Sequence, residues 1–117
     1  MDPDLGDIAW VEFGPVLGTE QAGRRPALVL SNKNYHEQSW RAVVCPITRK
    51  QRVWPFNVAL PPGLATTGMV LVDQVRSIDR SKRMFGIIEW APADLVAEVQ
   101  GRLFALLRLD GVALRPL

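Results

Sequence analysis

The sequence predicts a mainly β domain that ends in one amphipathic helix. Six short runs of apolar and β-branched residues occupy residues 7–88, and turns rich in glycine and proline separate them. After Trp90 the apolar residues recur every three or four positions, which is the spacing of a helix face. Short strands followed by one helix are typical of a small closed or half-closed barrel with the helix packed against it. The 117 residues are enough for one such domain, which we assign to residues 1–117.

The first half of the chain predicts three strands. Residues 7–13 are apolar and β-branched over most of their length, so we expect a strand that is buried on both faces. A second apolar run at residues 27–30 predicts the next strand, and the polar residues 31–39 predict a loop or a short helix. The third strand, residues 41–45, is expected to end at Pro46, because proline cannot donate a hydrogen bond to a strand ladder.

The second half predicts three more strands and the helix. Residues 56–60 alternate between apolar and polar, and residues 69–73 and 83–88 are further apolar runs. Pro92 suits the first turn of a helix, and Gly111 can end it. One stripe of this helix carries Leu95, Val99, Leu103 and Leu106.

The chain has one cysteine and one histidine. Cys45 cannot form an intrachain disulfide or a cysteine-based zinc site, and its apolar neighbours predict a buried structural thiol in a reducing, cytoplasmic compartment. His36 lies in the polar segment and is interpreted as exposed, without a role. No run reaches the roughly 18 apolar residues of a membrane span, and the acidic start lacks the layout of a signal peptide, so we expect no membrane partner.

Charge is distributed unevenly around a net value of +2. Residues 1–20 carry five acids and no lysine or arginine, whereas residues 21–60 carry seven lysines and arginines against one acid. Three of these cations, Arg49, Lys50 and Arg52, follow the third strand. A basic surface of this kind can bind an anionic partner whatever the net charge is.

Three polar groups beside apolar strands are candidates for chemistry. They are the loop that leads into the second strand, with Glu20, Gln21, Arg24 and Arg25; Thr48, two residues after Pro46; and the strand-end group Asp73, Gln74 and Arg76. Each also has a structural interpretation: a solvated loop with a surface ion pair, a hydroxyl that makes a local turn bond, and a plain ion pair. Taken singly, none of the three indicates a function.

Together, four stretches resemble a known family. Residues 6–13, 20–31, 45–48 and 73–78 are similar, in order, to the MazF/PemK/Kid toxins, the sequence-selective endoribonucleases of bacterial toxin–antitoxin modules. The segment Trp54-Pro55-Phe56 resembles the Tyr-Pro-Phe segment of the MazF branch. The resemblance covers most of the chain, from about residue 6 to about residue 108.

The resemblance implies an SH3-like small barrel of the CcdB/PemK type that works as a homodimer. It implies cleavage of single-stranded RNA without metal or cofactor, leaving 2′,3′-cyclic phosphate and 5′-hydroxyl ends. The family's catalytic arginine and threonine correspond to Arg25 and Thr48, its loop glutamate to Glu20 and its strand-end aspartate to Asp73. A guanidinium is protonated at neutral pH and is therefore a demanding proton acceptor, so Arg25 is expected to clamp phosphate, and Glu20, Arg25 and Asp73 stay open as the general base.

Substrate binding is expected to use the basic loop for phosphates and an aromatic ring for base stacking. Trp54 can serve as that ring or can cover the core, and for Phe56 the core is favoured. The expected binding residues are Arg24, Gln21, Arg49, Lys50, Arg52, Trp54, Phe56, Asp73, Gln74 and Arg76. The resemblance further implies a cognate acidic, MazE-like antitoxin over the basic groove. The alternative function is a non-catalytic SH3-like binding module or a gyrase-type poison of related fold.

Overall fold

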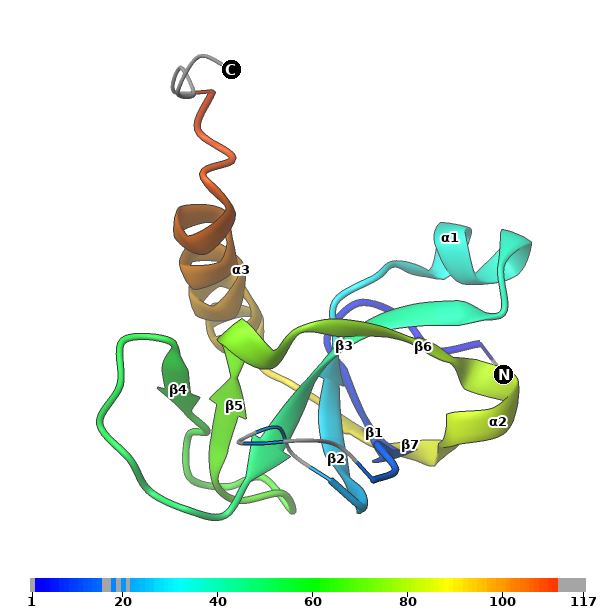
Figure 1. Ribbon diagram of the computed structural model, residues 1–117, viewed down its shortest axis with the longest axis horizontal. Helices are drawn as coiled ribbons and strands as arrows, with labels where there is room; N and C mark the ends of the chain where they lie inside the picture. Colours follow the sequence, from blue (N-terminus) through cyan, green and yellow to red (C-terminus); the bar gives the residue numbers. More distant parts are fainter. Residues whose placement is uncertain (1, 16–17, 19, 21, 112–117) are drawn as a thin grey trace.

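A curved antiparallel sheet with a helix at one side forms the protein (Figure 1), and the computed structural model describes residues 2–15, 18, 20 and 22–111. The strands are β1 (Asp7–Glu12), β2 (Arg24–Val29), β3 (Arg41–Thr48), β4 (Asn57–Ala59), β5 (Met69–Leu71), β6 (Arg76–Asp79) and β7 (Met84–Trp90). The helices are α1 (Lys33–Gln38), α2 (Arg80–Arg83) and α3 (Ala93–Leu107), and the 3₁₀ turn η1 covers Val72–Gln74. The sheet order is β4-β5-β3-β2-β1-β7, with β6 paired to β3. The predicted class, mainly β with a C-terminal helix, is confirmed.

The central strands are buried on both faces, as expected for residues 7–13. Alternate residues of each strand enter one of two apolar clusters, because successive side chains of a strand point to opposite faces. The helix-side cluster lies under Leu95 and Val99 of α3, whereas the inner cluster lies under β6 and its Ile78. The helix-side cluster includes Ile8, Leu28, Cys45, Ile47, Val58, Val70 and Val72. The inner cluster includes Ala9, Val11, Phe13, Ala27, Val29, Ala42 and Val44.

Cys45 is a buried structural thiol, as predicted. Its side chain is fully buried in the helix-side cluster. Burial, with a smaller contribution from the Asp73 carboxylate, raises the pKa of the Cys45 thiol to about 12. The side chain therefore stays protonated at neutral pH.

The sheet is half-closed, and a side chain joins its two edge regions. Strands β4 and β7 lie at opposite ends of the strand order. Glu89 of β7 accepts hydrogen bonds from the backbone amides of Ala65 and Thr66, at 3.0 and 2.8 Å, and from the Thr66 hydroxyl at 2.7 Å. These residues belong to the β4–β5 loop, so Glu89 ties this loop to β7.

The predicted limits of the second and third strands are wrong. Strand β2 begins at Arg24 and not at residue 27, because the ladder with β1 continues through Pro26, which lies opposite Trp10. Strand β3 does not end at Pro46 but runs on to Thr48. Pro46 falls where the neighbour of β3 on one side changes from β6 to β5, so its missing N–H interrupts no continuous ladder.

The segment after residue 71 also differs from the prediction. The expected strand at residues 69–73 stops at Leu71 and continues as η1, and the prediction missed both β6 and α2. Strand β6 carries a single buried apolar residue, Ile78, so it has no visible alternation. Helix α3 ends at Leu107, because Arg108 adopts a left-handed conformation (φ 55°), three residues before Gly111.

The interpretation of His36 as exposed is wrong. Of the loop and the short helix left open for residues 31–39, the structure has the helix, α1, and this helix directs His36 inward, where the residue is 3% exposed. Its Nδ1 donates to the Pro3 carbonyl at 2.6 Å, and its Nε2 bonds to the Ser31 hydroxyl at 2.7 Å. His36 therefore holds the N-terminal segment against the start of α1.

Within the described residues, no helix has the length and apolar character that a membrane crossing requires.

Candidate active site

The β2–β3 register directs the two predicted catalytic residues to the same end of the sheet. The paired residues are Val29 with Val44, Leu28 with Cys45 and Ala27 with Pro46, where the ladder ends. Continued by two residues, the same register sets Arg25 opposite Thr48. Because side chains alternate along a strand, Arg25 shares the face of Ala27 and Thr48 shares that of Val44, both in the inner cluster.

Thr48 sits at the end of β3 with little exposure. The residue is 6% exposed, and its Oγ1 accepts a hydrogen bond from the amide of Lys50 at 3.3 Å. Gly68 packs on its backbone: at φ +125°, a Cβ there would lie 2.0 Å from the Thr48 carbonyl oxygen. Sequence reasoning missed Gly68, although a glycine directly before a predicted strand is a signal for close backbone approach.

Arg25 is half-buried, and its Nε donates to the carbonyl of Ala22 at 2.9 Å. This bond uses one of the five guanidinium donors and fixes the side chain at the start of β2. Glu20 is exposed in the preceding loop, and Gln21 lies outside the described residues. Arg24, adjacent to Arg25, faces the other side of the sheet, where its guanidinium lies 4.0 Å from the centre of the Phe85 ring. The structure therefore separates Arg24 from Arg25.

Arg76 joins the face of Arg25 and Thr48. It lies opposite Val44 in the β3–β6 ladder, is half-buried and donates from Nη1 to the Phe13 carbonyl at 3.4 Å. Its guanidinium also lies 5.6 Å from the centre of the Phe13 ring. One end of the inner face thus carries two guanidiniums and a hydroxyl.

Asp73 and Gln74 lie in η1 and not at a strand end. The Asp73 carboxylate accepts a hydrogen bond from the Trp54 indole Nε1 at 2.9 Å, whereas Arg76 bonds to Phe13. Asp73 and Arg76 therefore do not form the plain ion pair that the sequence left open.

The basic loop between β3 and β4 is exposed over residues 49–55, and Arg49, Lys50 and Arg52 carry its charge. Backbone atoms of Arg52 contact residues of β5 and β4: its amide donates to the sulfur of Met69 in β5, and its carbonyl accepts from the side chain of Asn57 in β4, each at 3.3 Å. Trp54 is 48% exposed. Phe56 packs against the helix-side cluster, as predicted.

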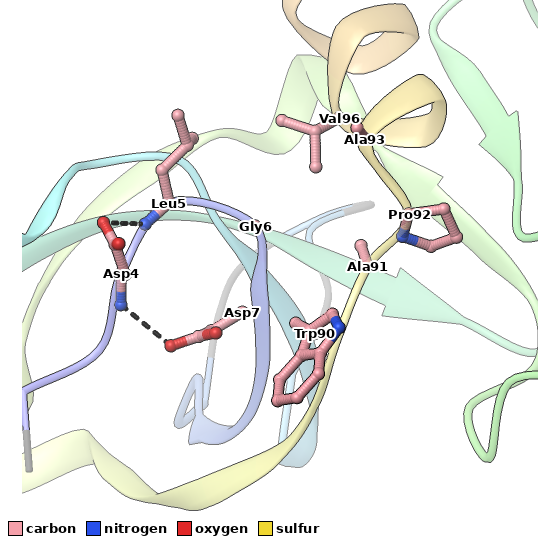
Figure 2. Close-up of a pocket in the computed structure, with 9 residues that line it drawn as sticks. All are labelled: Asp4, Leu5, Gly6, Asp7, Trp90, Ala91, Pro92, Ala93 and Val96. Carbon is pink, nitrogen blue, oxygen red and sulfur yellow. Dashed lines mark hydrogen bonds between the residues drawn. The ribbon is translucent and has the colours of Figure 1, made fainter.

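A surface pocket of about 630 Å³ lies at the other end of the sheet (Figure 2). It is formed where β1 begins and α3 starts. Trp90, on its wall, pairs with Asp7 at the beginning of β1, whereas Arg25 pairs with Val11 near the end of β1, so the pocket and Arg25 lie at opposite ends of this strand. Both of its carboxylates accept local backbone hydrogen bonds: Asp4 from Leu5 and Asp7 from Asp4, each at 2.8 Å. The pocket therefore gathers none of the predicted catalytic residues.

The arrangement at the Arg25 end suits a phosphate-bearing ligand. A guanidinium can donate two parallel hydrogen bonds to phosphate oxygens, and a hydroxyl beside it can donate a third. Among the described residues, no group of three or more His, Cys, Asp or Glu side chains could hold a metal ion. Fold and site together define a class: a small, half-closed β protein with a C-terminal helix and an arginine–threonine site next to a cationic loop.

Comparisons with known proteins identify the family. The model of the PemK-like, MazF-like toxins of type II toxin–antitoxin systems matches residues 4–107. The chain is 45% identical over 76 residues to the endoribonuclease toxin MazF of Escherichia coli K12, covering 65% of this chain and 68% of that protein. It is 36% identical over 110 residues to the endoribonuclease PemK of Escherichia coli, covering 91% and 83%.

Solved structures of related toxins have the same fold as this chain. MazF from Deinococcus radiodurans superposes with a TM-score of 0.86 at 44% identity, covering 91% of this chain and 96% of that one. A MazE–MazF complex from the same organism superposes with a TM-score of 0.81 at 42% identity and the same coverage. The chain belongs to the PemK-like, MazF-like toxin family, so the resemblance seen in the four sequence stretches is confirmed.

Proposed function

We propose that this protein is an endoribonuclease toxin that cleaves single-stranded RNA at the Arg25–Thr48 site without a metal ion. Membership of the family makes it a toxin of a type II toxin–antitoxin system. The observation that supports the catalytic assignment is the β2–β3 register, which pairs Ala27 with Pro46 and, continued by two residues, sets Arg25 opposite Thr48. The endoribonuclease names of its Escherichia coli relatives support the reaction class.

The proposed reaction is attack of a ribose 2′-hydroxyl on the adjacent phosphorus. The 2′-hydroxyl gives up its proton, the P–O5′ bond breaks, and the leaving O5′ oxygen takes up a proton from the protonated base or from solvent, so the products carry a 2′,3′-cyclic phosphate and a 5′-hydroxyl. Charge develops on the non-bridging phosphate oxygens, and stabilising such charge is usually the largest single contribution to catalysis. Arg25 clamps these oxygens with its two terminal nitrogens, and Thr48 holds a phosphate oxygen or orients the 2′-hydroxyl. DNA lacks this hydroxyl and is not cut.

Proton transfer needs a group other than a clamping arginine. Glu20 is our candidate for accepting the 2′-hydroxyl proton or for orienting Arg25, since it lies in the loop directly before β2. A carboxylate there needs to come within hydrogen-bond reach of the 2′-oxygen, so we expect the loop to close over bound RNA.

The basic loop extends the site along the RNA backbone. Arg49, Lys50 and Arg52 follow Thr48 directly and are exposed, so they can neutralise successive phosphates. Arg76, on the face of Arg25, adds a further cation to these three. Gln21, Arg24 and Gln74 remain proposed RNA contacts, and for Arg24 the stacking on Phe85 implies a contact on the other side of the sheet.

We also propose the partners of the module. Complexes of MazE with MazF are known for a related toxin, and an acidic, MazE-like antitoxin segment would compete with RNA for the basic loop. We further propose a cytoplasmic homodimer, in which two copies of this small site supply one binding groove.

The test is cleavage of long single-stranded RNA in EDTA, with the ends of the products mapped. Arg25→Ala and Thr48→Val remove one functional group each, so both should lower kcat by about a hundredfold or more. Lys82→Ala and Thr67→Val are matched exposed controls outside the site and should cleave normally. Full cleavage by both site variants would overturn the catalytic assignment. Wild-type protein that binds RNA without cutting it would favour the alternative function, a non-catalytic binding module.

A further inference from the structure

Trp54 is an exposed side chain whose orientation is fixed. Its indole Nε1 donates to Asp73 Oδ2 at 2.9 Å, and its ring centre lies 6.0 Å from that of Phe56, which is anchored in the helix-side cluster. Its backbone carbonyl accepts from the amide of Asn57 at 2.9 Å. The residue as a whole is nevertheless 48% exposed. A large flat ring held at its edge while much of its surface faces solvent is suited to stacking with a planar ligand.

The next residue is held from a different element. The Pro55 carbonyl accepts a hydrogen bond from Nη1 of Arg102, and Nη2 of Arg102 pairs with Glu98 one turn earlier on α3, at 3.1 Å. The segment Trp54–Pro55 is therefore attached to both η1 and α3. The cationic residues of the same loop lie between this segment and Thr48.

We propose that Asp73 is a positioning residue for the RNA substrate. Its carboxylate fixes the edge of Trp54, so that the exposed ring stands ready as a stacking platform for a base near the cleaved phosphate, and Arg102 holds the same segment through Pro55. This inference rests on the proposed function and replaces the general-base role left open for Asp73. Fixing the ring before RNA arrives lowers the entropy cost of binding, so the effect belongs to substrate affinity.

Two substitutions of Asp73 separate positioning from proton transfer. The side-chain oxygen of Asp73→Asn can still accept from the indole N–H, whereas Asp73→Ala leaves that donor without its partner. With an RNA whose cut position has been mapped, we expect Asp73→Asn to keep kcat and KM within about twofold of wild type. Asp73→Ala should raise KM about tenfold with kcat nearly unchanged. A loss of about a hundredfold in kcat for Asp73→Asn would show a proton-transfer role and overturn the proposal.

A double-mutant cycle links the effect to Trp54. Trp54→Phe keeps an aromatic ring but removes the indole N–H, so it should raise KM by about as much as Asp73→Ala. The double variant should be no worse than either single variant, because both remove one interaction. Trp90→Phe is the matched control: this tryptophan is 79% exposed and lines the separate pocket shown in Figure 2, so the KM of the Trp90→Phe variant should equal that of wild type. Additive increases in KM would contradict the coupling.

A spectroscopic readout does not depend on cleavage. The indole N–H proton of Trp54, identified as the NMR signal that Trp54→Phe removes, should shift and exchange faster with solvent in Asp73→Ala but not in Asp73→Asn. An unchanged signal in Asp73→Ala would refute the anchor in solution. If the wild-type protein cuts no RNA but the signal still shifts in Asp73→Ala, the result counts against the proposed function and not against the anchor. Binding of an RNA with a 2′-deoxy nucleotide at the cut position would then test the stacking platform directly.

Discussion

Substituting Gly68 with alanine tests whether the position of Thr48 controls catalysis. A Cβ at residue 68 would lie 2.0 Å from the Thr48 carbonyl oxygen and 2.8 Å from its carbonyl carbon. Non-bonded heavy atoms attract at about 3.5 Å and repel steeply at much shorter distances. The two backbones must therefore separate by about 1 Å or more to restore an allowed contact.

The displacement predicts a loss of stability and a loss of activity. The positive φ of +125° adds backbone strain to the clash, and together they should lower the free energy of unfolding by about 2–4 kcal/mol. The molecules that remain folded should also lose activity, because a shift of about 1 Å in a reacting group can cost roughly a hundredfold in rate. The folded fraction of Gly68→Ala should therefore cleave RNA about a hundredfold more slowly than wild type.

Gly63 provides the matched control. It lies in the same β4–β5 loop with a φ of +98°, but a Cβ there would meet no atom within 4 Å. Gly63→Ala should thus carry the strain of about 1–3 kcal/mol without moving Thr48. Urea unfolding gives the stability of each variant, and initial cleavage rates below the unfolding transition give its activity. Wild-type kcat/KM in folded Gly68→Ala, or an equal loss of activity in Gly63→Ala, would refute the reasoning.

Two further predictions concern the fold. Although desolvation raises the pKa of Glu89, its hydrogen bonds from the Thr66 hydroxyl and from the Ala65 and Thr66 amides outweigh this effect and hold the pKa below the usual 4.5. The ionised carboxylate therefore stabilises the fold above that pH, and the contribution is lost as pH falls through the lowered folded-state pKa. Glu89→Gln should lower the free energy of unfolding by about 1–2 kcal/mol at pH 7. In urea titrations at progressively lower pH, the difference in this free energy between Glu89→Gln and wild type should shrink. A difference that stays constant with pH would show that the charge of the Glu89 carboxylate does not stabilise the fold. Cys45, fully buried with a pKa of about 12, should react with a disulfide reagent at pH 8 only after denaturant is added, and prompt labelling of the native protein would contradict its burial.

Local sequence predicted the elements that contain several apolar residues. Strands β1 and β5 lie in continuous apolar runs, and helix α3 carries a periodic apolar stripe. Strand β6 has Ile78 alone, so its place in the sheet is decided by pairing with β3. His36 was misread for the same reason, because its partner Pro3 is 33 residues away in the chain.

The candidate site was only partly predictable. The resemblance named Arg25 and Thr48, but their placement on one face follows from the β2–β3 register, which no local pattern contains. The sequence places Arg24 and Arg25 in one loop, but β2 already begins at Arg24, so the two are neighbouring strand residues whose side chains point to opposite faces of the sheet. The partner of Asp73 is likewise set by the loop that returns Trp54 to η1, across 19 residues.

These contacts place the candidate site at a junction between two parts of the sheet. Arg25 lies on β2, which pairs along most of its length with β1, whereas Thr48 lies beyond Pro46, where β3 is paired with β5. Strands β4 and β5 have three residues each, and strands this short depend on packing and side-chain contacts for their position. Glu89 and Arg102 supply such contacts from β7 and α3. Substitutions of Glu89 and Arg102 should therefore disturb the positions of Thr48 and Trp54. Strands β1 and β2, with Arg25, should stay in place, so these substitutions test the candidate site as well as the fold.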